Sequence, residues 1–352
     1  MKTKKKIAWS DYLTYLGVTA AFIIVTLLKN GGGLNRSQQG LLVPICAYIT
    51  MAISLNLTVG ILGELSLGHA GFMSIGAFSG VIVAMGLMNA IPSAPMRMAI
   101  AMIVGALMAG CFGFLIGIPV LRLRGDYLAI VTLAFGEIIK EILNCLIVGV
   151  DSRGLHVIIN INGSKTAADL NLLEGGKAII KGAQGAVGTK TIASFTAGYI
   201  LIMISLIVIL NLIRSRSGRA IMAIRDNRNA AESVGIEITK YKMMAFVTSA
   251  AIAGAAGALY GLNYSSLSAT KFDFNTSILV LVFVVLGGLG NIWGSIIAAT
   301  VLYILPEALR SFADYRMLIY AIVLIVVMLA TNSSRVKELV EKLKARKKEE
   351  EE

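Results

Sequence analysis

The side chains that could do chemistry in this 352-residue chain are few. Its two histidines are His69 and His156, and its three cysteines, at positions 46, 111 and 145, lie in apolar stretches. No two of the cysteines have the spacing of a disulfide framework or of a metal-binding motif. Two histidines are also too few for a multi-histidine metal site. We therefore expect neither catalytic residues nor metal ligands in this chain.

One apolar segment, 127–150, contains three charged side chains, Glu137, Lys140 and Glu141. Charges at membrane depth are costly and mark functional positions by default. Glu137 and Lys140 are three residues apart, so they share a helix face and can pair. Two interpretations stay open: a role along the path of a solute, or a structural pair where the helix nears the membrane surface.

His69 lies between Gly68 and Gly71, shortly after Ser66. This pattern predicts the start or break of a helix that faces a cavity, and the N-terminus of such a half-helix can bind a substrate carboxylate. The alternative is a buried histidine hydrogen-bonded to a neighbouring helix. Ser66, His69 and Glu137 are our candidates for residues of a substrate pathway.

The glycine-rich segment 182–191 is similar to a phosphate-binding loop, but Thr189 stands between its last glycine and Lys190. That motif requires the lysine directly after the glycine and a strand before the loop. We reject the motif and expect no ATPase site on this chain. Any ATP used must be hydrolysed by a partner.

The composition identifies the elements that must position these residues. Apolar residues make up 57% of the chain and charged residues 15%, against about 25% charged in soluble domains. This excludes a soluble or disordered chain and predicts an all-α polytopic membrane protein of about ten transmembrane or partly re-entrant helices. The segments 277–289 and 295–309 are short enough to be tilted, broken or re-entrant. The predicted spans are 12–28, 40–59, 65–85, 98–121, 127–150, 194–213, 243–263, 277–289, 295–309 and 317–330.

The formal net charge of +12 comes from basic residues between apolar runs. Because no aromatic side chains are interleaved with them as a stacking platform, we do not expect nucleic-acid binding. Basic residues gather on cytoplasmic loops, which places both termini in the cytoplasm. We divide the chain into an N-terminal anchor span (1–35), a transmembrane domain (36–331) that includes the cytoplasmic loop 214–242, and a charged cytoplasmic tail (332–352).

Four glycine pairs have the spacing that lets helices approach closely in a membrane. We expect them to pack helices within the chain, although the same spacing suits helices that slide. The pairs are Gly76/Gly80, Gly113/Gly117, Gly257/Gly261 and Gly290/Gly294.

The most informative segment is the predicted cytoplasmic loop 214–242. Its apolar residues Ile221, Ile224, Ala231 and Val234 predict one face of a helix. Asp226 or Asn227 could cap a short helix, and Gly235 could end it. Such a helix could dock into a groove of a partner or lie on the membrane surface.

At this loop the sequence resembles the permease subunits of branched-chain amino acid ABC transporters, in particular the LivM type. Four blocks in this order carry the resemblance: LSLGHAGF at 65–72, LRLRGDYLAIVTLAFGEI at 121–138, the stretch from Gly218 through Gly235 to Tyr260, and VLGGLG at 285–290. Two positions depart from the family pattern. Asp226 is followed by Asn227-Arg228-Asn229 instead of further acids, and the family's Arg-Pro-x-Gly element is replaced by residues 331–334.

The resemblance implies an importer subunit for Leu, Ile and Val in a bacterial-type cell membrane. Its implied partners are a second related permease, two cytoplasmic ATPase subunits and an extracytoplasmic solute-binding protein. ATP and Mg would be bound by the ATPase subunits, and this chain would carry no cofactor. The loop would couple ATPase closure to the permease through Gly218, Arg219, Arg225, Asp226, Ala230, Ala231, Glu232 and Gly235.

Other functions stay open at this point. Related permeases for urea or short amides share much of the pattern, but usually lack the run at Ala230–Gly235, which favours amino acids here. A stand-alone channel or secondary transporter would need intramembrane ionisable groups, of which segment 127–150 has the only concentrated set. An intramembrane enzyme would need a catalytic cluster, and we find none in the sequence.

Overall fold

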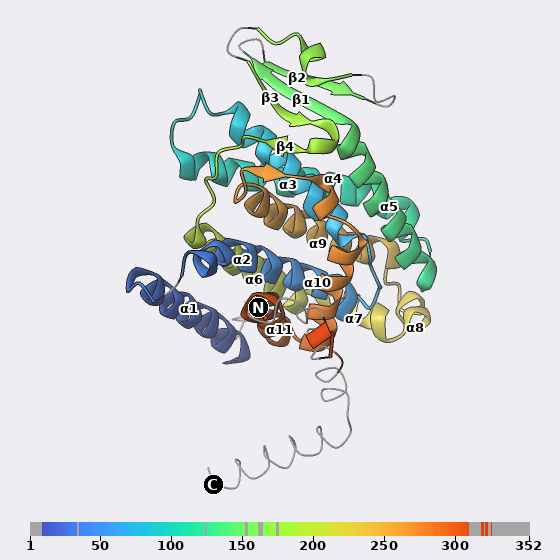
Figure 1. Ribbon diagram of the computed structural model, residues 1–352. Coiled ribbons are helices and arrows are strands. Elements are labelled where there is room, and N and C mark those ends of the chain that lie inside the picture. The colour runs from blue at the N-terminus through green and yellow to red at the C-terminus, as the bar shows by residue number, and fades with distance from the viewer. Residues whose placement is uncertain are drawn as a thin grey trace.

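The computed structural model describes residues 9–309 except 34, 124, 152–153, 161–164 and 174–175, together with 318–319, 321–322 and 325. Helices dominate this part of the chain, and most of them lie side by side in one bundle (Figure 1). Their bounds are α1 Trp9–Asn30, α2 Arg36–Asn56, α3 His69–Gly86, α4 Ala94–Val120, α5 Asp126–Cys145, α6 Phe195–Arg214, α7 Arg216–Asp226, α8 Arg228–Ser233, α9 Ile238–Gly261, α10 Phe274–Gly287 and α11 Ile292–Ala308.

Seven of the described helical segments are long and apolar enough to cross a membrane, and α11 is a shorter apolar helix. α5 has 20 residues, comparable to these, but carries the charges of Glu137, Lys140 and Glu141. The helical membrane class is thus confirmed. Three predicted features lie outside the described residues: the basic residues 2–6, the tail 332–352 and most of the span 317–330. Only five residues of that span are described.

A small sheet stands at one end of the bundle, and the sequence analysis did not predict it (Figure 1). The predicted span 127–150 is wrong in its last turn, because α5 ends at Cys145 and residues 146–151 form a strand. Leu146 to Val150 are mostly β-branched, which favours strands. The order is β2-β1-β3-β4-β5, with every pair antiparallel. The strands are β1 Leu146–Asp151, β2 Gly154–Ile159, β3 Lys177–Lys181, β4 Ala186–Val187 and β5 Ser266–Leu267.

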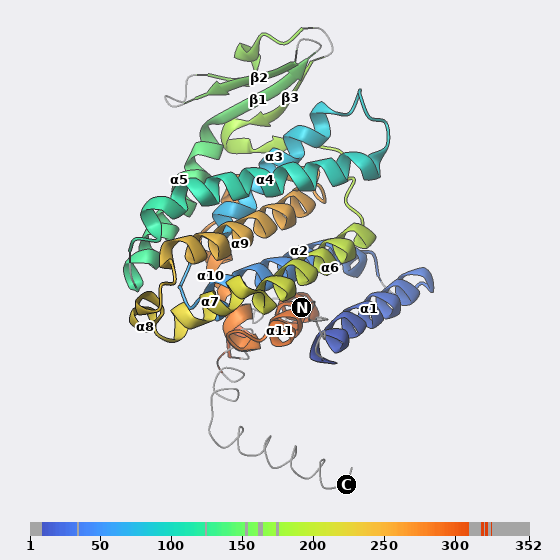
Figure 2. The ribbon, with the colours of Figure 1, turned by 180° about the vertical axis from the view of Figure 1, so that it is seen from behind.

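Glycines bring α3, α4 and α9 together in the centre of the bundle (Figure 2). A Cβ on Gly76 would overlap the backbone of Gly254, and one on Gly257 would overlap the carbonyl of Met73. Gly113 and Gly117 likewise meet α9, at Ala250 and Met243. These three pairs therefore pack helices, as predicted.

The fourth pair has a different role. Gly290 has a φ of +82° and lies in the turn between α10 and α11. Only Gly294 is helical, and it meets the carbonyl of Gly287 across that turn. The prediction of a helix-packing pair is wrong here, because the chain reverses direction between the two glycines.

α2 does not run straight into a loop. Asn56 ends it, a π-helical turn follows at Leu57–Ile61, and α3 begins at His69. Between them lies a short irregular segment with Gly63 at a φ of +79°. The predicted helix start at His69 is confirmed.

α1 lies at the edge of the bundle (Figures 1 and 2). Phe22 stacks on Phe195 and Tyr199, and Thr19 shares a hydrogen bond of 2.9 Å with the hydroxyl of Tyr199. Most of its other apolar side chains are exposed, as expected of a helix whose outer surface meets lipid.

Candidate coupling site and pathway

The loop between α6 and α9 forms two short helices, α7 and α8, rather than one. Ser215 Oγ accepts a hydrogen bond of 3.1 Å from Gly218 N and so caps α7. Asn227 Oδ1 accepts one of 3.0 Å from Ala230 N and caps α8. Both use the free amides at a helix start. Of the two candidate caps, Asn227 has this role.

Gly235 ends the second helix as predicted. Its φ is +83°, a conformation that glycine adopts without strain. Its N–H donates to Glu232 O at 3.0 Å, and the N–H of Ile236 donates to Ala231 O at 3.1 Å. The chain therefore turns sharply back towards α9.

A small apolar cluster holds α7 and α8 against the start of α9. Ile224, Ala231 and Ile238 form it, and Ile221 is buried in the main core. Val234, the fourth residue of the predicted apolar face, is 76% exposed, so its assignment to that face is wrong. Val234 follows Ser233, the last residue of α8, and so does not belong to the apolar face of that helix. Together with Ala230 and Glu232 it leaves an exposed surface on α8.

Two of the three arginines of α7, Arg219 and Arg225, point in different directions. Arg219 is exposed, and its Nη1 donates to Arg214 O at 3.4 Å. Arg225 reaches inward: its Nη1 donates to Gly60 O at 3.1 Å, while Nε and Nη2 donate to Asp226 Oδ1 at 3.1 and 3.0 Å. Gly218 is buried where a Cβ would overlap the carbonyls that end α6.

Sequence reasoning missed a second link at the same place. Lys242 of α9 pairs with the carboxylate of Glu64, and the lysine side chain is 2% exposed. A buried ammonium group requires such a partner. The available signal was a lone lysine at the boundary of an apolar run, but its partner lies 178 positions away.

His69 and Ser66 are both buried. His69 Nε2 lies 2.7 Å from Ser54 Oγ, and Ser249 Oγ donates to Ser54 O at 2.6 Å, so three helices meet there. This geometry matches the second interpretation of His69, a buried histidine bonded to a neighbouring helix. Ser66 Oγ has no hydrogen-bond partner within the described residues.

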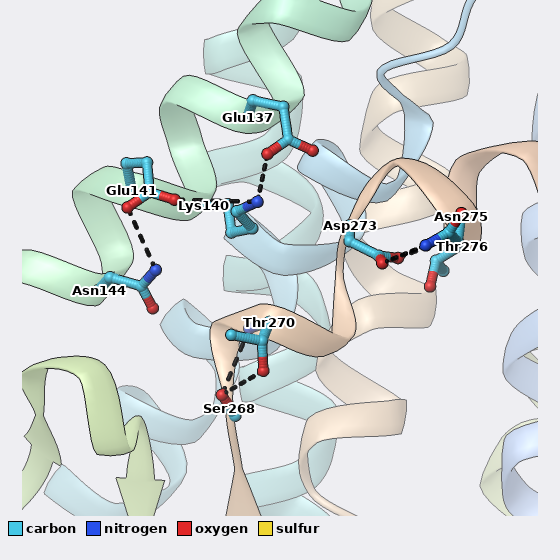
Figure 3. Close-up of polar contacts among 9 residues, drawn as sticks. All are labelled: Glu137, Lys140, Glu141, Asn144, Ser268, Thr270, Asp273, Asn275 and Thr276. Atoms are coloured by element: carbon cyan, nitrogen blue, oxygen red, sulfur yellow. Dashed lines mark hydrogen bonds and ion pairs between the residues drawn. The ribbon is translucent and has the colours of Figure 1, made fainter.

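Glu137 lies apart from this pair, on the side of α5 that faces the segment leading into α10 (Figure 3). It pairs with Lys140, as its spacing predicted. Glu141 contacts Lys140 at 3.8 Å and accepts a bond of 3.4 Å from Asn144. Glu137 is close to Asp273, in the turn before α10, and to Gly71 and Ser277.

This polar patch is partly exposed in the isolated chain. The side chain of Glu137 is 39% exposed and that of Glu141 is 66% exposed. Charged groups on a spanning helix avoid lipid and face protein or water. The face formed by α5 and the start of α10 is therefore unsuited to contact with lipid tails.

The chain is similar to known proteins over most of its length. Residues 39–329 match the family described as branched-chain amino acid transport system / permease component. The chain is 35% identical over 295 residues to the high-affinity branched-chain amino acid transport system permease protein LivM of Escherichia coli K12, covering 80% of this chain and 66% of LivM. LivM of Salmonella typhimurium gives the same identity and coverage over 291 residues.

BraD of Pseudomonas aeruginosa, named as a permease of the same kind of system, is 25% identical over 72% of this chain and 79% of its own length. No solved structure is significantly similar to the chain. The chain spans slightly less than two thirds of the LivM proteins that it matches. The family match covers most of the chain and includes its described apolar helices from α2 onward, so this multi-pass membrane protein belongs to the branched-chain amino acid transport permease family.

Proposed function

We propose that this chain is a translocation subunit of an ATP-binding cassette importer that carries Leu, Ile and Val into the cytoplasm. The observation that carries the proposal is the pair α7–α8. It is anchored to the bundle by buried residues and presents an exposed surface between two spanning helices. The substrate class is that of the LivM and BraD relatives, which are named as branched-chain amino acid transport permeases.

The exposed surface of α8 suits a groove on an ATPase subunit. A short helix that lays part of its surface into a groove is a common recognition mode. In this proposal Ala230, Glu232 and Gly235 meet the ATPase, while Ala231 anchors the helix from behind. ATP and Mg bind to two partner ATPase subunits, and this chain serves as a permease without its own ATPase site.

The substrate path runs along the face of α5 and the start of α10. Three charged residues line this face: Glu137, Lys140 and Asp273. They would face the water of the path and a second, related permease on its other side, so their charges would not contact lipid. Ser66 and His69 lie behind this face, where the segment before α3 contacts α5 through a bond of 3.1 Å from Leu67 N to Thr132 Oγ1. An extracytoplasmic solute-binding protein would deliver the amino acid at the end with the sheet. Both termini lie in the cytoplasm of a bacterial-type cell.

The decisive experiment is purification of the tagged chain from its native membrane, followed by reconstitution of the co-purified complex in vesicles. We expect a second permease and ATPase subunits to co-purify, and we expect ATP-dependent uptake of radiolabelled leucine when the binding protein is added. If the binding protein bound urea or short amides and did not bind leucine, the substrate class would be urea or amides instead of branched-chain amino acids. Uptake by the chain alone, driven by an ion gradient, would overturn the proposal.

A further inference from the structure

Two cations, one before and one after α8, hold the same short segment of the bundle. Arg225 at the end of α7 donates to Gly60 O at 3.1 Å, and its side chain lies over Gly63. Lys242 near the start of α9 pairs with Glu64. Residues 60–64, which run from the end of the π-helical turn towards α3, are therefore tied to both flanks of α8.

The same segment is joined to the turn between α10 and α11. Asn56, fully buried, accepts a bond of 2.8 Å from Gly290 N through Oδ1 and donates one of 2.8 Å to Ser295 Oγ through Nδ2. A Cβ on Gly60 would overlap both Asn56 Oδ1 and Gly290 N. The two backbones are thus in direct contact, and neither can move far without the other.

The α10–α11 turn follows α10, and the first residues of α10 lie beside the polar patch. α10 begins beside Asp273, and Ser277 Oγ accepts a bond of 3.1 Å from Ala70 N at the start of α3. The connecting element is a π-helical turn, a wider turn that often occurs at functional sites. A continuous set of bonds therefore leads from α7 through residues 56–64 to α10.

We propose that Arg225 and Lys242 are positioning residues that transmit movement of the cytoplasmic helices through residues 56–64 to the α10–α11 turn. This role rests on the proposed function. It differs from an ATPase contact, because Lys242 is buried and because Arg225, although 39% of its side chain is exposed, donates to a backbone carbonyl of the bundle. Arg225 is the residue to test first, since Arg216 offers a matched control: it is an exposed arginine on the same helix.

The test uses the full reconstituted complex with Cys111→Ser and Cys145→Ser, and spin labels at Leu289→Cys and Leu107→Cys. Leu289 lies in the α10–α11 turn and Leu107 on α4, and both are exposed. We expect ATP to change the distance between the labels, and Arg225→Met to abolish that change while Arg216→Met preserves it. Amino acid transported per ATP hydrolysed should fall about tenfold in Arg225→Met, within the usual range of coupling effects.

A double variant separates transmission from simple loss of stability. If Arg225 and Asn56 act in one path, Arg225→Met combined with Asn56→Leu should be no worse than the more severe single variant. Arg225→Lys, which keeps one donor, should retain part of the coupling.

Three results would overturn the inference. The first is a label distance in Arg225→Met that still responds to ATP, and the second is a loss of coupling in the double variant that equals the product of the two single losses. The third is a loss of uptake in Arg225→Met that is matched by an equal loss of ATPase activity. Failure of the proposed function is distinguishable, because the unmodified complex would then show no ATP-driven uptake.

Discussion

His69 Nε2 lies 2.7 Å from Ser54 Oγ, and this contact joins the first residue of α3 to α2 across the break between them. Both side chains are buried. Removing the hydroxyl by Ser54→Ala leaves the imidazole without this partner, and a buried polar group left unpaired costs about 1–3 kcal/mol. We expect Ser54→Ala to lower the unfolding temperature of the purified chain in detergent. Ser79→Ala, which removes only bonds to its own helix, is the control and should change it far less.

Glu137 should matter for uptake rather than for folding. Its side chain is 39% exposed and pairs with Lys140 on the polar face. Since an exposed pair contributes at most about 1 kcal/mol to stability, Glu137→Gln should leave the unfolding temperature nearly unchanged. We expect it to reduce leucine uptake in vesicles several-fold. If each of the single variants Glu137→Ala, Ser66→Ala and His69→Ala left leucine uptake unchanged, all three residues would be removed from the pathway.

The pair of Lys242 and Glu64 should behave as a buried ion pair. Lys242→Met leaves the carboxylate without its ammonium partner, and breaking such a pair costs about 3–5 kcal/mol. We expect a clear loss of thermal stability in Lys242→Met. Combining it with Glu64→Leu should restore most of that loss, because both charges are then gone. A double variant as unstable as the single one would show that Lys242 stabilises the fold in another way.

The end of α8 should be essential for coupling but not for folding. Gly235 has a φ of +83°, which proline cannot adopt, so Gly235→Pro should redirect the chain between α8 and α9. Glu232→Arg reverses a charge on the exposed surface. We expect both variant complexes to assemble and to lose substrate-stimulated ATPase activity. Normal stimulation in either complex would argue against the ATPase-docking role of α8.

Glycine packing in the bundle can be tested with a matched pair of alanine substitutions. A Cβ on Gly257 would overlap the carbonyl of Met73, whereas Gly40 of α2 has nothing near that position. Overpacking costs about 1–3 kcal/mol, so Gly257→Ala should lower thermal stability. Gly40→Ala should be neutral or gain up to about 1 kcal/mol from helix propensity. Equal behaviour of the two variants would contradict the close contact of α3 and α9.

Local features were predictable because their causes lie within a few residues. The apolar runs fixed the helical membrane class. The helix cap, predicted at Asp226 or Asn227 and found at Asn227, the turn at Gly235 and the pairing of Glu137 with Lys140 each join residues separated by five positions or fewer. The family resemblance, carried by four ordered blocks, likewise required no three-dimensional information.

Features that join distant parts of the chain were decided only by the tertiary structure. The sheet brings 266–267 to 186–187, and a two-residue strand has too little pattern to be predicted. The bond from Arg225 to Gly60 spans 165 positions and ends on a backbone carbonyl, which every residue possesses. Side-chain types alone therefore could not identify that partner, and neither could they show that Lys242 meets Glu64. The packing of α2, α7 and α9 against one another makes those choices, because it brings Gly60 O within reach of Arg225 and Glu64 within reach of the buried Lys242.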